Sequence, residues 1–205
     1  YYLPAFLSGS RVLISTGTRT LQDQLYGRDL PLLRRVLGSP VKVSLLKGRS
    51  NYLCLYRVDR IELDPRLDPP GLAEDLLAVR RWAGRTRSGD RAGLDEVPAE
   101  RPIWSRVTST VDNCLGQDCP CYSDCFLMEA RRRAQESDII VVNHHLLLAD
   151  MALKQTGHGE VLPSVDGYIL DEAHQLPEIA RNFFGSAVGS RQILDLARDL
   201  QTEAS

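Results

Sequence analysis

The sequence lacks the features of a membrane, secreted or strongly basic protein. None of its apolar runs reaches the length of a transmembrane helix, and no signal peptide is visible. Lysine is scarce: three of the 25 basic residues are lysine, so 22 are arginine. The net charge of -2 excludes a globally basic nucleic-acid binder but is compatible with a local basic groove. A cytoplasmic protein with no membrane partner is therefore expected.

The sequence also lacks a phosphate-binding loop. The pattern G-x-x-x-x-G-K-[ST] does not occur in the chain. The first residue is Tyr1 rather than Met, and the opening "YYLPAFL" resembles the middle of a helix. The 205 residues are enough for one large domain or two small ones. We expect the chain to be a fragment of a longer protein.

Short apolar runs alternate with helix-forming segments in much of the chain. Strands are predicted at 12–14 and 40–48, at the beginning of 138–153 before a helix, and within 166–174, where the strand ends in carboxylates. A Ser-Thr-Gly-Thr turn follows the first run, with Thr18 or Thr20 as the expected N-cap of the next helix. Buried strands that alternate with helices predict an α/β fold with a mostly parallel sheet.

The middle of the chain has a different composition. Residues 64–102 contain five prolines, many charges and one helical stretch, 72–84. We therefore predict a mostly helical insertion at 50–133, bracketed by Cys54 and Cys125, within a sheet domain formed by 1–49 and 134–185. A polar amphipathic helix at 190–201 suggests that 186–205 begin a further region.

Four of the five cysteines lie within "DNCLGQDCPCYSDC", residues 112–125. Cys114, Cys119 and Cys125 have four and then five residues between them, and Cys54 would close the site from upstream. Four thiolates suit either a [4Fe–4S] cluster or structural zinc. The spacings are looser than those of most zinc pairs, which favours the cluster over zinc and over a chance grouping. Spacing alone does not exclude Cys121 as a replacement for Cys119 or Cys125.

An apolar strand ends in two carboxylates in "YILDEAH". Asp171 and Glu172 are expected at the carboxyl edge of the sheet, where ligands bind in open α/β folds. An Asp there can hold Mg²⁺ through water, and the Glu can polarise the water that attacks a γ-phosphate. His174 could sense the state of the nucleotide. The alternative is that the acids only begin a helix, but the whole pattern favours the catalytic interpretation.

Several segments together resemble the iron–sulfur DNA helicases of superfamily 2, in the XPD-like group and its DinG/YoaA branch. "LDEAH" resembles the DEAH-type motif II (Walker B), and "VLISTGTRTLQDQL" is similar to motif Ia. "LKGRSNYLC" resembles the segment before the first cluster cysteine, and "VVNHHLL" the strand and helix after the cluster domain. The resemblance covers roughly residues 1 to 185 and implies a partial RecA-like (P-loop NTPase type) domain interrupted by a cluster insertion.

The resemblance also implies roles for individual residues. The family's C-x4-C-x5-C pattern matches Cys114, Cys119 and Cys125, which with Cys54 would hold a [4Fe–4S] cluster, and Cys121 falls at a non-ligand position. Contacts with single-stranded DNA are implied for Thr16, Thr18, Arg19, Lys47, Arg49 and Tyr52. The alternatives are that the threonines cap a helix, that Lys47 and Arg49 are solvated charges, and that Tyr52 packs on the cluster loop.

The implied parent protein is an ATP-dependent 5′-to-3′ DNA helicase that uses Mg²⁺ and unwinds forked or overhang DNA in repair or replication. Residues 186–205 resemble the start of the arch insertion, and a monomer is expected. Because the Walker A motif and the second motor domain are missing, the chain alone is predicted not to hydrolyse ATP. The competing hypothesis is a zinc-stabilised DNA-binding module without motor activity, and a weaker third is a redox sensor that uses Cys121.

Overall fold

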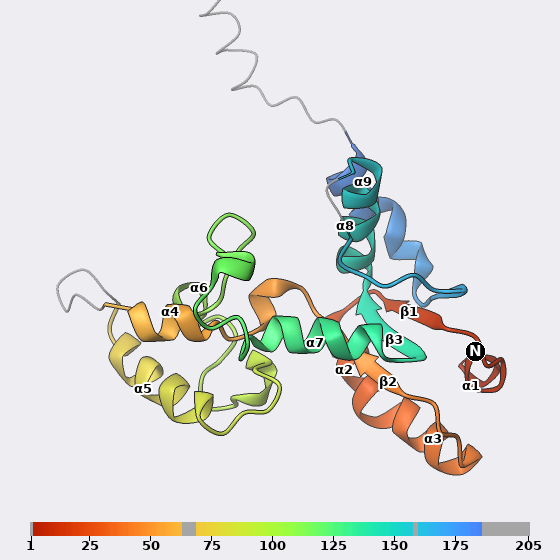
Figure 1. Ribbon diagram of the computed structural model, residues 1–205, viewed down its shortest axis with the longest axis horizontal. Helices are drawn as coiled ribbons and strands as arrows, with labels where there is room; N and C mark the ends of the chain where they lie inside the picture. Colours follow the sequence, from red (N-terminus) through yellow and green to blue (C-terminus); the bar gives the residue numbers. More distant parts are fainter. Residues whose placement is uncertain (1, 63–68, 158–159, 186–205) are drawn as a thin grey trace, which may run out of the picture.

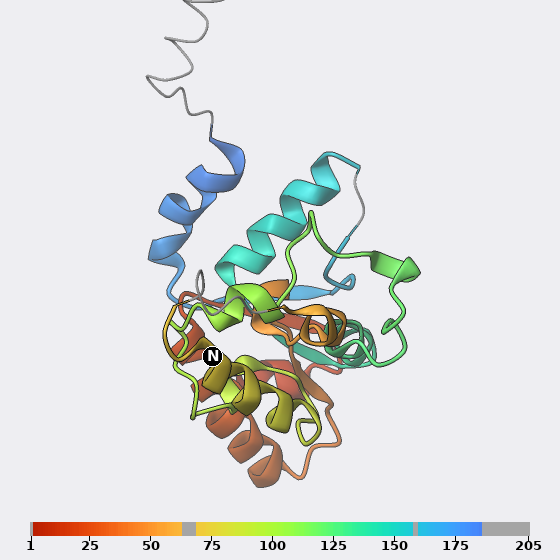
Figure 2. The same cartoon turned by 90° about the vertical axis from the view of Figure 1, so that its left-hand side faces the viewer.

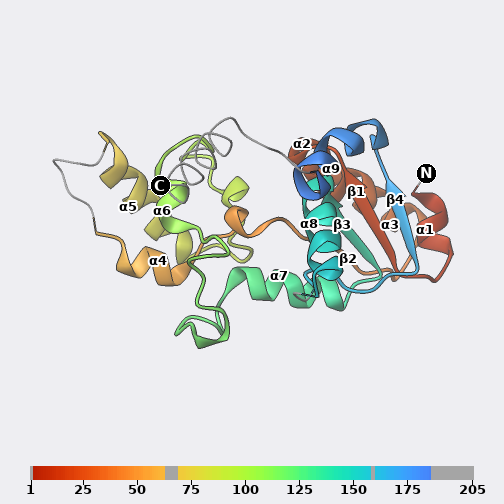
Figure 3. The same ribbon diagram turned by 90° about the horizontal axis from the view of Figure 1, so that it is seen from above.

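The computed structural model describes residues 2–62, 69–157 and 160–185. A sheet with flanking helices lies at one end, a helical unit lies at the other, and α7 (Phe126–Gln135) runs between them (Figures 1 and 3). The helix predicted at 190–201 falls outside the described residues. Within these ranges, no helix combines the length and apolar character needed to cross a membrane.

Four parallel strands form the sheet in the order β2-β3-β1-β4. The central strands, β1 (Val12–Thr16) and β3 (Ile139–Asn143), pair with each other. β4 (Gly167–Leu170) pairs with β1, and β2 (Val43–Leu45) pairs with β3. The predicted α/β class and parallel sheet are confirmed, although β2 is shorter than the strand predicted at 40–48.

Each face of the sheet has its own apolar layer because successive strand residues point to opposite faces. Leu13 and Ile140 pack towards α7 and α8, whereas Ile14 and Val141 pack towards α1 and α3. Helices α8 and α9 lie side by side and extend away from the sheet (Figure 2). The helices of this part are α1 (Leu3–Leu7), α2 (Arg19–Gln24), α3 (Leu30–Leu37), α8 (His144–Gln155) and α9 (Leu176–Phe184). A π-helical turn, Leu25–Asp29, joins α2 to α3, and a 3₁₀ turn, Ala173–Gln175, precedes α9.

The helical unit has a separate apolar core. Trp82 and Trp104 meet edge to face, with ring centroids 6.2 Å apart, and the Trp104 indole N–H donates to the carbonyl of Pro98. The helix predicted at 72–84 is confirmed. The unit contains α4 (Leu55–Arg60), α5 (Leu72–Ala83), α6 (Ile103–Val107) and the 3₁₀ turns Arg49–Asn51, Arg91–Gly93 and Gly116–Asp118.

The helical unit meets the start of α7 at a glycine. Gly89 has a φ of 62°, and a Cβ added to it would lie 2.2 Å from the ring of Phe126. Its carbonyl accepts a hydrogen bond from the backbone N–H of Leu53. A side chain at this position would therefore both strain the backbone and push α7 away from the unit.

The segment between α6 and α7 holds four cysteines and is almost without packing. We call residues 110–125 the cysteine loop. None of its side chains is buried, and the half-buried ones are the four cysteines and Tyr122. Its backbone hydrogen bonds are those of local turns, such as Cys119 N–H to Gly116 and Tyr122 N–H to Cys119. Apolar burial therefore does little to fix this loop.

Candidate functional site

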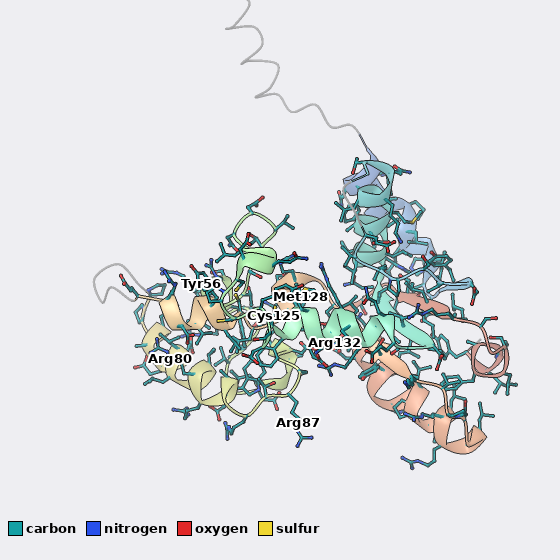
Figure 4. All side chains as sticks on the ribbon, viewed as in Figure 1. Tyr56, Arg80, Arg87, Cys125, Met128 and Arg132 are labelled. Carbon is teal, nitrogen blue, oxygen red and sulfur yellow. The ribbon has the colours of Figure 1, made fainter. Side chains whose placement is uncertain are left out.

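All five cysteines line one cavity of about 230 Å³. Cys54 precedes α4 and Cys125 precedes α7, so both are N-cap residues, while the others come from the cysteine loop. All five thiols are free. Cys125 lies at the start of α7, on the side of the helical unit (Figure 4). The fold thus brings Cys54 to the cysteine loop.

Three other thiols lie close enough to Cys54 to affect its acidity. Burial raises the pKa of Cys54, the backbone N–H of Arg57 opposes this shift, and Cys119, Cys125 and Cys114 raise the pKa further. The last three effects are electrostatic, because an ionised thiol is unfavourable beside others that can carry the same charge. Cys54 and the three loop cysteines therefore share one electrostatic environment.

Cys121 lies in the same cavity, so position alone does not separate it from the other four. Burial raises its pKa, and the neighbouring Cys119 raises it further. Within the described ranges, no group of three or more His, Cys, Asp or Glu side chains is placed so that it could hold a metal ion. The thiols surround the cavity without meeting at one point.

The carboxylates of "LDEAH" lie at the carboxyl end of β4. The backbone N–H of Asp171 donates to Ser15 of β1, and its carboxylate accepts a hydrogen bond of 3.1 Å from the Tyr2 hydroxyl. Burial, followed by this bond to Asp171, raises the pKa of Tyr2 to about 12. Among the described residues, Glu172 is the one non-glycine residue with a positive φ, which is 53°. Such strain often occurs at functional sites.

His174 and Glu172 lie together at the surface. His174 Nδ1 is 3.3 Å from Glu172 Oε2, and both side chains are exposed. Neither is enclosed by other side chains, in contrast to the half-buried Asp171. Both groups are therefore accessible to a ligand at this edge.

A buried histidine lies beneath this edge. His144, the first residue of α8, is fully buried, and its Nδ1 is 2.7 Å from Ser15 Oγ. Burial lowers its pKa, while backbone groups of Asp171 and Glu172 act in the opposite direction. No hydrogen bond reaches its Nε2 from the described residues. The ends of β1, β3 and β4 therefore meet around the two carboxylates.

The turn after β1 touches the segment after the carboxylates. A Cβ added to Gly17 would lie 2.5 Å from the Oε1 atom of Gln175. Because Gly17 belongs to the Ser-Thr-Gly-Thr turn and Gln175 follows "LDEAH", the two motifs are in direct contact. A change in the position of one motif would therefore be transmitted directly to the other.

The threonine hydroxyls of this turn form hydrogen bonds with backbone groups. Thr18 is confirmed as the N-cap of α2, because its hydroxyl accepts from the Leu21 N–H at 3.2 Å. Thr16 is buried and donates its hydroxyl to the carbonyl of Thr18. The side chain of Arg19 falls outside the described part of the structure.

Lys47 is buried where the sheet meets the helical unit. Its ammonium lies 2.6 Å from Asp23 Oδ1 on α2 and 2.7 Å from Asp90 Oδ2 in the helical unit, and its side chain is 3 % exposed. A DNA contact from Lys47 would require both ion pairs to break. The structure therefore gives this residue a clear role as a link between the two parts.

Tyr52 and Arg49 lie near Lys47 but differ in exposure. Tyr52 is 5 % exposed, and its hydroxyl accepts from the Lys47 backbone N–H at 3.0 Å. Burial raises the pKa of Tyr52 to about 12. Its ring would have to leave the core before it could stack on a base. Arg49 is half-buried and lines the cysteine cavity.

Sequence reasoning missed several partners of the predicted residues. The structure adds Tyr2 beside Asp171, Asp23 and Asp90 beside Lys47, and Arg131 at the cysteine cavity. Each partner is far along the chain or belongs to another element. No local spacing could have indicated these pairs, whereas the three consecutive arginines 131–133 were at least visible as a charge run.

Comparison with known proteins finds relatives among bacterial DNA helicases. No family model matches the chain. It is 49 % identical over 200 residues to the ATP-dependent DNA helicase YoaA of Escherichia coli strain K12, and 46 % identical to YoaA of Haemophilus influenzae strain Rd. The chain is homologous to part of these helicases. Each match covers 98 % of the chain but 31 % of the relative, so the chain spans about a third of their length.

The similarity extends to a second group of helicases. The ATP-dependent helicase DinG of Mycobacterium tuberculosis strain H37Rv is 36 % identical over 200 residues, which cover 87 % of the chain and 29 % of the relative. The resemblance to the DinG/YoaA branch is thereby confirmed. The parallel sheet is the α/β core expected for a helicase domain.

Proposed function

We propose that this chain supplies part of an ATP-dependent DNA helicase of the YoaA/DinG kind. The observation that carries the proposal is the meeting of three strand ends around Asp171 and Glu172, with Gly17 of the motif Ia turn against Gln175. Ligands of open α/β folds bind at this edge. A contact between the predicted nucleotide motif and the predicted DNA motif would allow ATP hydrolysis to be coupled to DNA movement.

The roles at this edge follow from position and chemistry. Asp171 would hold Mg²⁺ through water, Glu172 would orient and polarise the attacking water, and His174 would respond to the nucleotide state. Mg²⁺ would supply neutralisation of phosphate charge. Tyr2 holds the Asp171 carboxylate in one orientation by its hydrogen bond. The positive φ of Glu172 turns the chain sharply after β4.

The cysteines are proposed to hold a [4Fe–4S] cluster. The ligands would be Cys54, Cys114, Cys119 and Cys125, with Cys121 as a further thiol in the cavity. Two observations support a bound group: all five thiols line one cavity, and the cysteine loop has no buried side chain of its own. A loop of this kind needs a ligand to order it, as small metal-binding domains do. Cluster binding would draw the thiols inward.

The DNA interface is proposed at the start of α2 and at the cysteine cavity's rim. Backbone N–H groups after Thr18 and the Arg19 side chain would contact phosphates, and Arg49 would add positive charge. We propose that Lys47 and Tyr52 support this surface rather than touch DNA, because both are buried. The Lys47 ammonium is held by two carboxylates, and its backbone N–H donates to the Tyr52 hydroxyl.

The domain organisation is proposed on the same basis. Residues 1–49 and 134–185 would form part of motor domain one, and 50–133 would form the cluster insertion. The segment 186–205, which the structure does not describe, would begin the arch insertion. The 5′-to-3′ direction is tested with duplexes that carry either a 5′ or a 3′ single-stranded overhang.

Metal analysis tests the cluster directly. Iron, acid-labile sulfide and zinc are measured on anaerobically purified protein, beside Cys119→Ser and Cys121→Ser. About four irons and four sulfides per chain are expected, retained in the Cys121 variant and lost in the Cys119 variant. One zinc without sulfide would instead favour the zinc-stabilised DNA-binding module.

Hydrolysis is tested in the longest polypeptide that contains this sequence. Glu172→Gln should abolish DNA-stimulated ATP hydrolysis and leave ATP binding intact, because it removes the group that polarises water. The chain alone is expected to show no hydrolysis. Upstream coding sequence offers a rapid check: a G-x-x-x-x-G-K-[ST] loop there supports the motor, and its absence argues for a DNA-binding module.

A further inference from the structure

Two arginine side chains line the cysteine cavity and have no carboxylate partner among the residues that the structure describes. Arg131 of α7 and Arg49 both line this cavity. Neither forms an ion pair with any residue that the structure describes. The Nε atom of Arg131 is buried and has no hydrogen-bond partner within the described ranges. Both arginines are half-buried, and a partly desolvated cation without a partner is costly, so a negative group in the cavity would offset that cost.

The next two arginines of α7 have a different environment. Arg132 pairs with Glu129, and its side chain is 64 % exposed. Arg133 also pairs with Glu129, with Nε 3.2 Å from Oε1. Arg132 is marked on α7, and Cys125 lies at the helix start (Figure 4). Of three consecutive arginines, one therefore faces the thiols and two are neutralised at the surface.

The electrostatic interactions of Arg131 are consistent with this position. Burial and then the nearby Arg49 lower its pKa, whereas Cys114 and Cys125 raise it. Two of the proposed cluster ligands are thus close enough to act on the charge of Arg131. By the same interaction, the charge of Arg131 acts on whatever these two thiols bind.

We propose that Arg131, assisted by Arg49, raises the reduction potential of the iron–sulfur cluster held by these cysteines. This inference rests on the cluster proposed above. Reduction adds one electron to the cluster and makes or breaks no bond, so negative charge grows beside the two guanidinium groups. A nearby cation stabilises the reduced cluster more than the oxidised one, and local charge and hydrogen bonds to sulfur set such potentials.

The test is a redox titration of the cluster-containing chain without DNA. An electrode supplies the electrons through a mediator dye, and the visible absorption of the cluster reports its reduction. Arg131→Gln is expected to disfavour reduction about tenfold, which corresponds to a potential about 59 mV more negative for a one-electron couple. Arg131→Lys, which keeps the charge, should remain near the wild-type potential.

Arg132→Gln is the matched control. It removes the same charge from the same helix, one residue away, but from a side chain that already pairs with Glu129. Its potential should equal that of the wild type. Equal shifts in Arg131→Gln and Arg132→Gln, or an equal shift in Arg131→Lys and Arg131→Gln, would overturn the inference.

Iron and sulfide analysis separates the two possible failures. A wild-type chain without iron and sulfide would contradict the proposed cluster itself. A cluster of unchanged potential in Arg131→Gln would contradict only the role of Arg131. If Arg131→Gln loses its cluster, Arg49→Gln takes its place in the titration: a more negative potential supports the inference, and an unchanged one overturns it.

Discussion

The sheet and the cysteine loop are stabilised in opposite ways. Strands β1 and β3 are buried almost throughout, with apolar layers on both faces. The cysteine loop buries no side chain and has only local turns. Burial of apolar surface, the main driving force of folding, therefore acts on the sheet and hardly on the loop. We therefore expect the order of the loop to depend on the cluster that is proposed for its cysteines.

This difference matches the tasks proposed for the two regions. Carboxylates that act on a nucleotide need a rigid support, because small displacements of catalytic groups cost large factors in rate. The proposed cluster would have to enter its site after folding of the chain begins, and a loop without a packed core would admit iron and sulfide. The helical unit next to the loop has its own core around Trp82 and Trp104, so it can support the loop without help from the sheet.

The largest effect is expected from removal of a proposed cluster ligand. Cys119→Ser should abolish the cluster and leave the backbone amides of the cysteine loop unprotected against hydrogen exchange. The sheet amides of β1 and β3 should keep their protection, because their burial does not involve the loop. Hydrogen exchange measured on the wild type and on Cys119→Ser, with Cys121→Ser as the control, checks this. Loss of protection throughout the sheet would show that the two regions are not separable.

The second largest effect is expected in the core of the sheet. Ile140→Ala removes a fully buried side chain of β3 and should lower the free energy of unfolding by about 2 to 5 kcal/mol. Urea denaturation followed by circular dichroism measures it. Leu32→Ala on α3, where the side chain is 54 % exposed, is the matched control and should change stability by less than about 0.5 kcal/mol. Equal effects would contradict the assigned burial.

Sequence reasoning succeeded where a local pattern reports a local structure. The apolar runs predicted the parallel strands, and the Ser-Thr-Gly-Thr turn predicted the Thr18 cap, because both depend on neighbouring residues. It could not find the partners of Lys47, since Asp23 and Asp90 are brought together only by the tertiary fold. For the same reason the sequence did not indicate that Lys47 and Tyr52, which were predicted as DNA contacts, are buried. All five thiols line one cavity, so their positions do not show which four would be ligands. The choice of Cys54, Cys114, Cys119 and Cys125 therefore rests on the family resemblance.

The junction between the two parts should give an intermediate effect. Asp90→Asn removes one of the two charges that neutralise the buried Lys47 ammonium and should cost about 1 to 3 kcal/mol. Asn can still cap the following turn, as Asp90 does by accepting from the Ala92 N–H. Thermal or urea unfolding measures the change.

A surface ion pair provides the control for the junction. Glu96→Gln removes the partner of Arg81, whose closest approach is 3.5 Å and whose side chain is 63 % exposed. Such pairs are screened by water, so a change below about 1 kcal/mol is expected. If Asp90→Asn costs no more than Glu96→Gln, the Lys47 junction does not join the two parts energetically.

The smallest effect at neutral pH is expected from Tyr52→Phe, which leaves the Lys47 N–H without its acceptor and should lower the free energy of unfolding by about 1 kcal/mol.

The pH dependence of stability tests the burial of Tyr52 more directly. Burial raises the pKa of Tyr52 from 10.0 to about 12, so its contribution to stability is complete below pH 10 and is lost as the pH rises towards 12. Unfolding measured across this range should show the wild type losing about 2 to 3 kcal/mol more than the variant. Tyr56→Phe, at a half-buried site, serves as the control. Parallel curves for wild type and Tyr52→Phe would mean that Tyr52 is solvated, and its ring would again be available to a base.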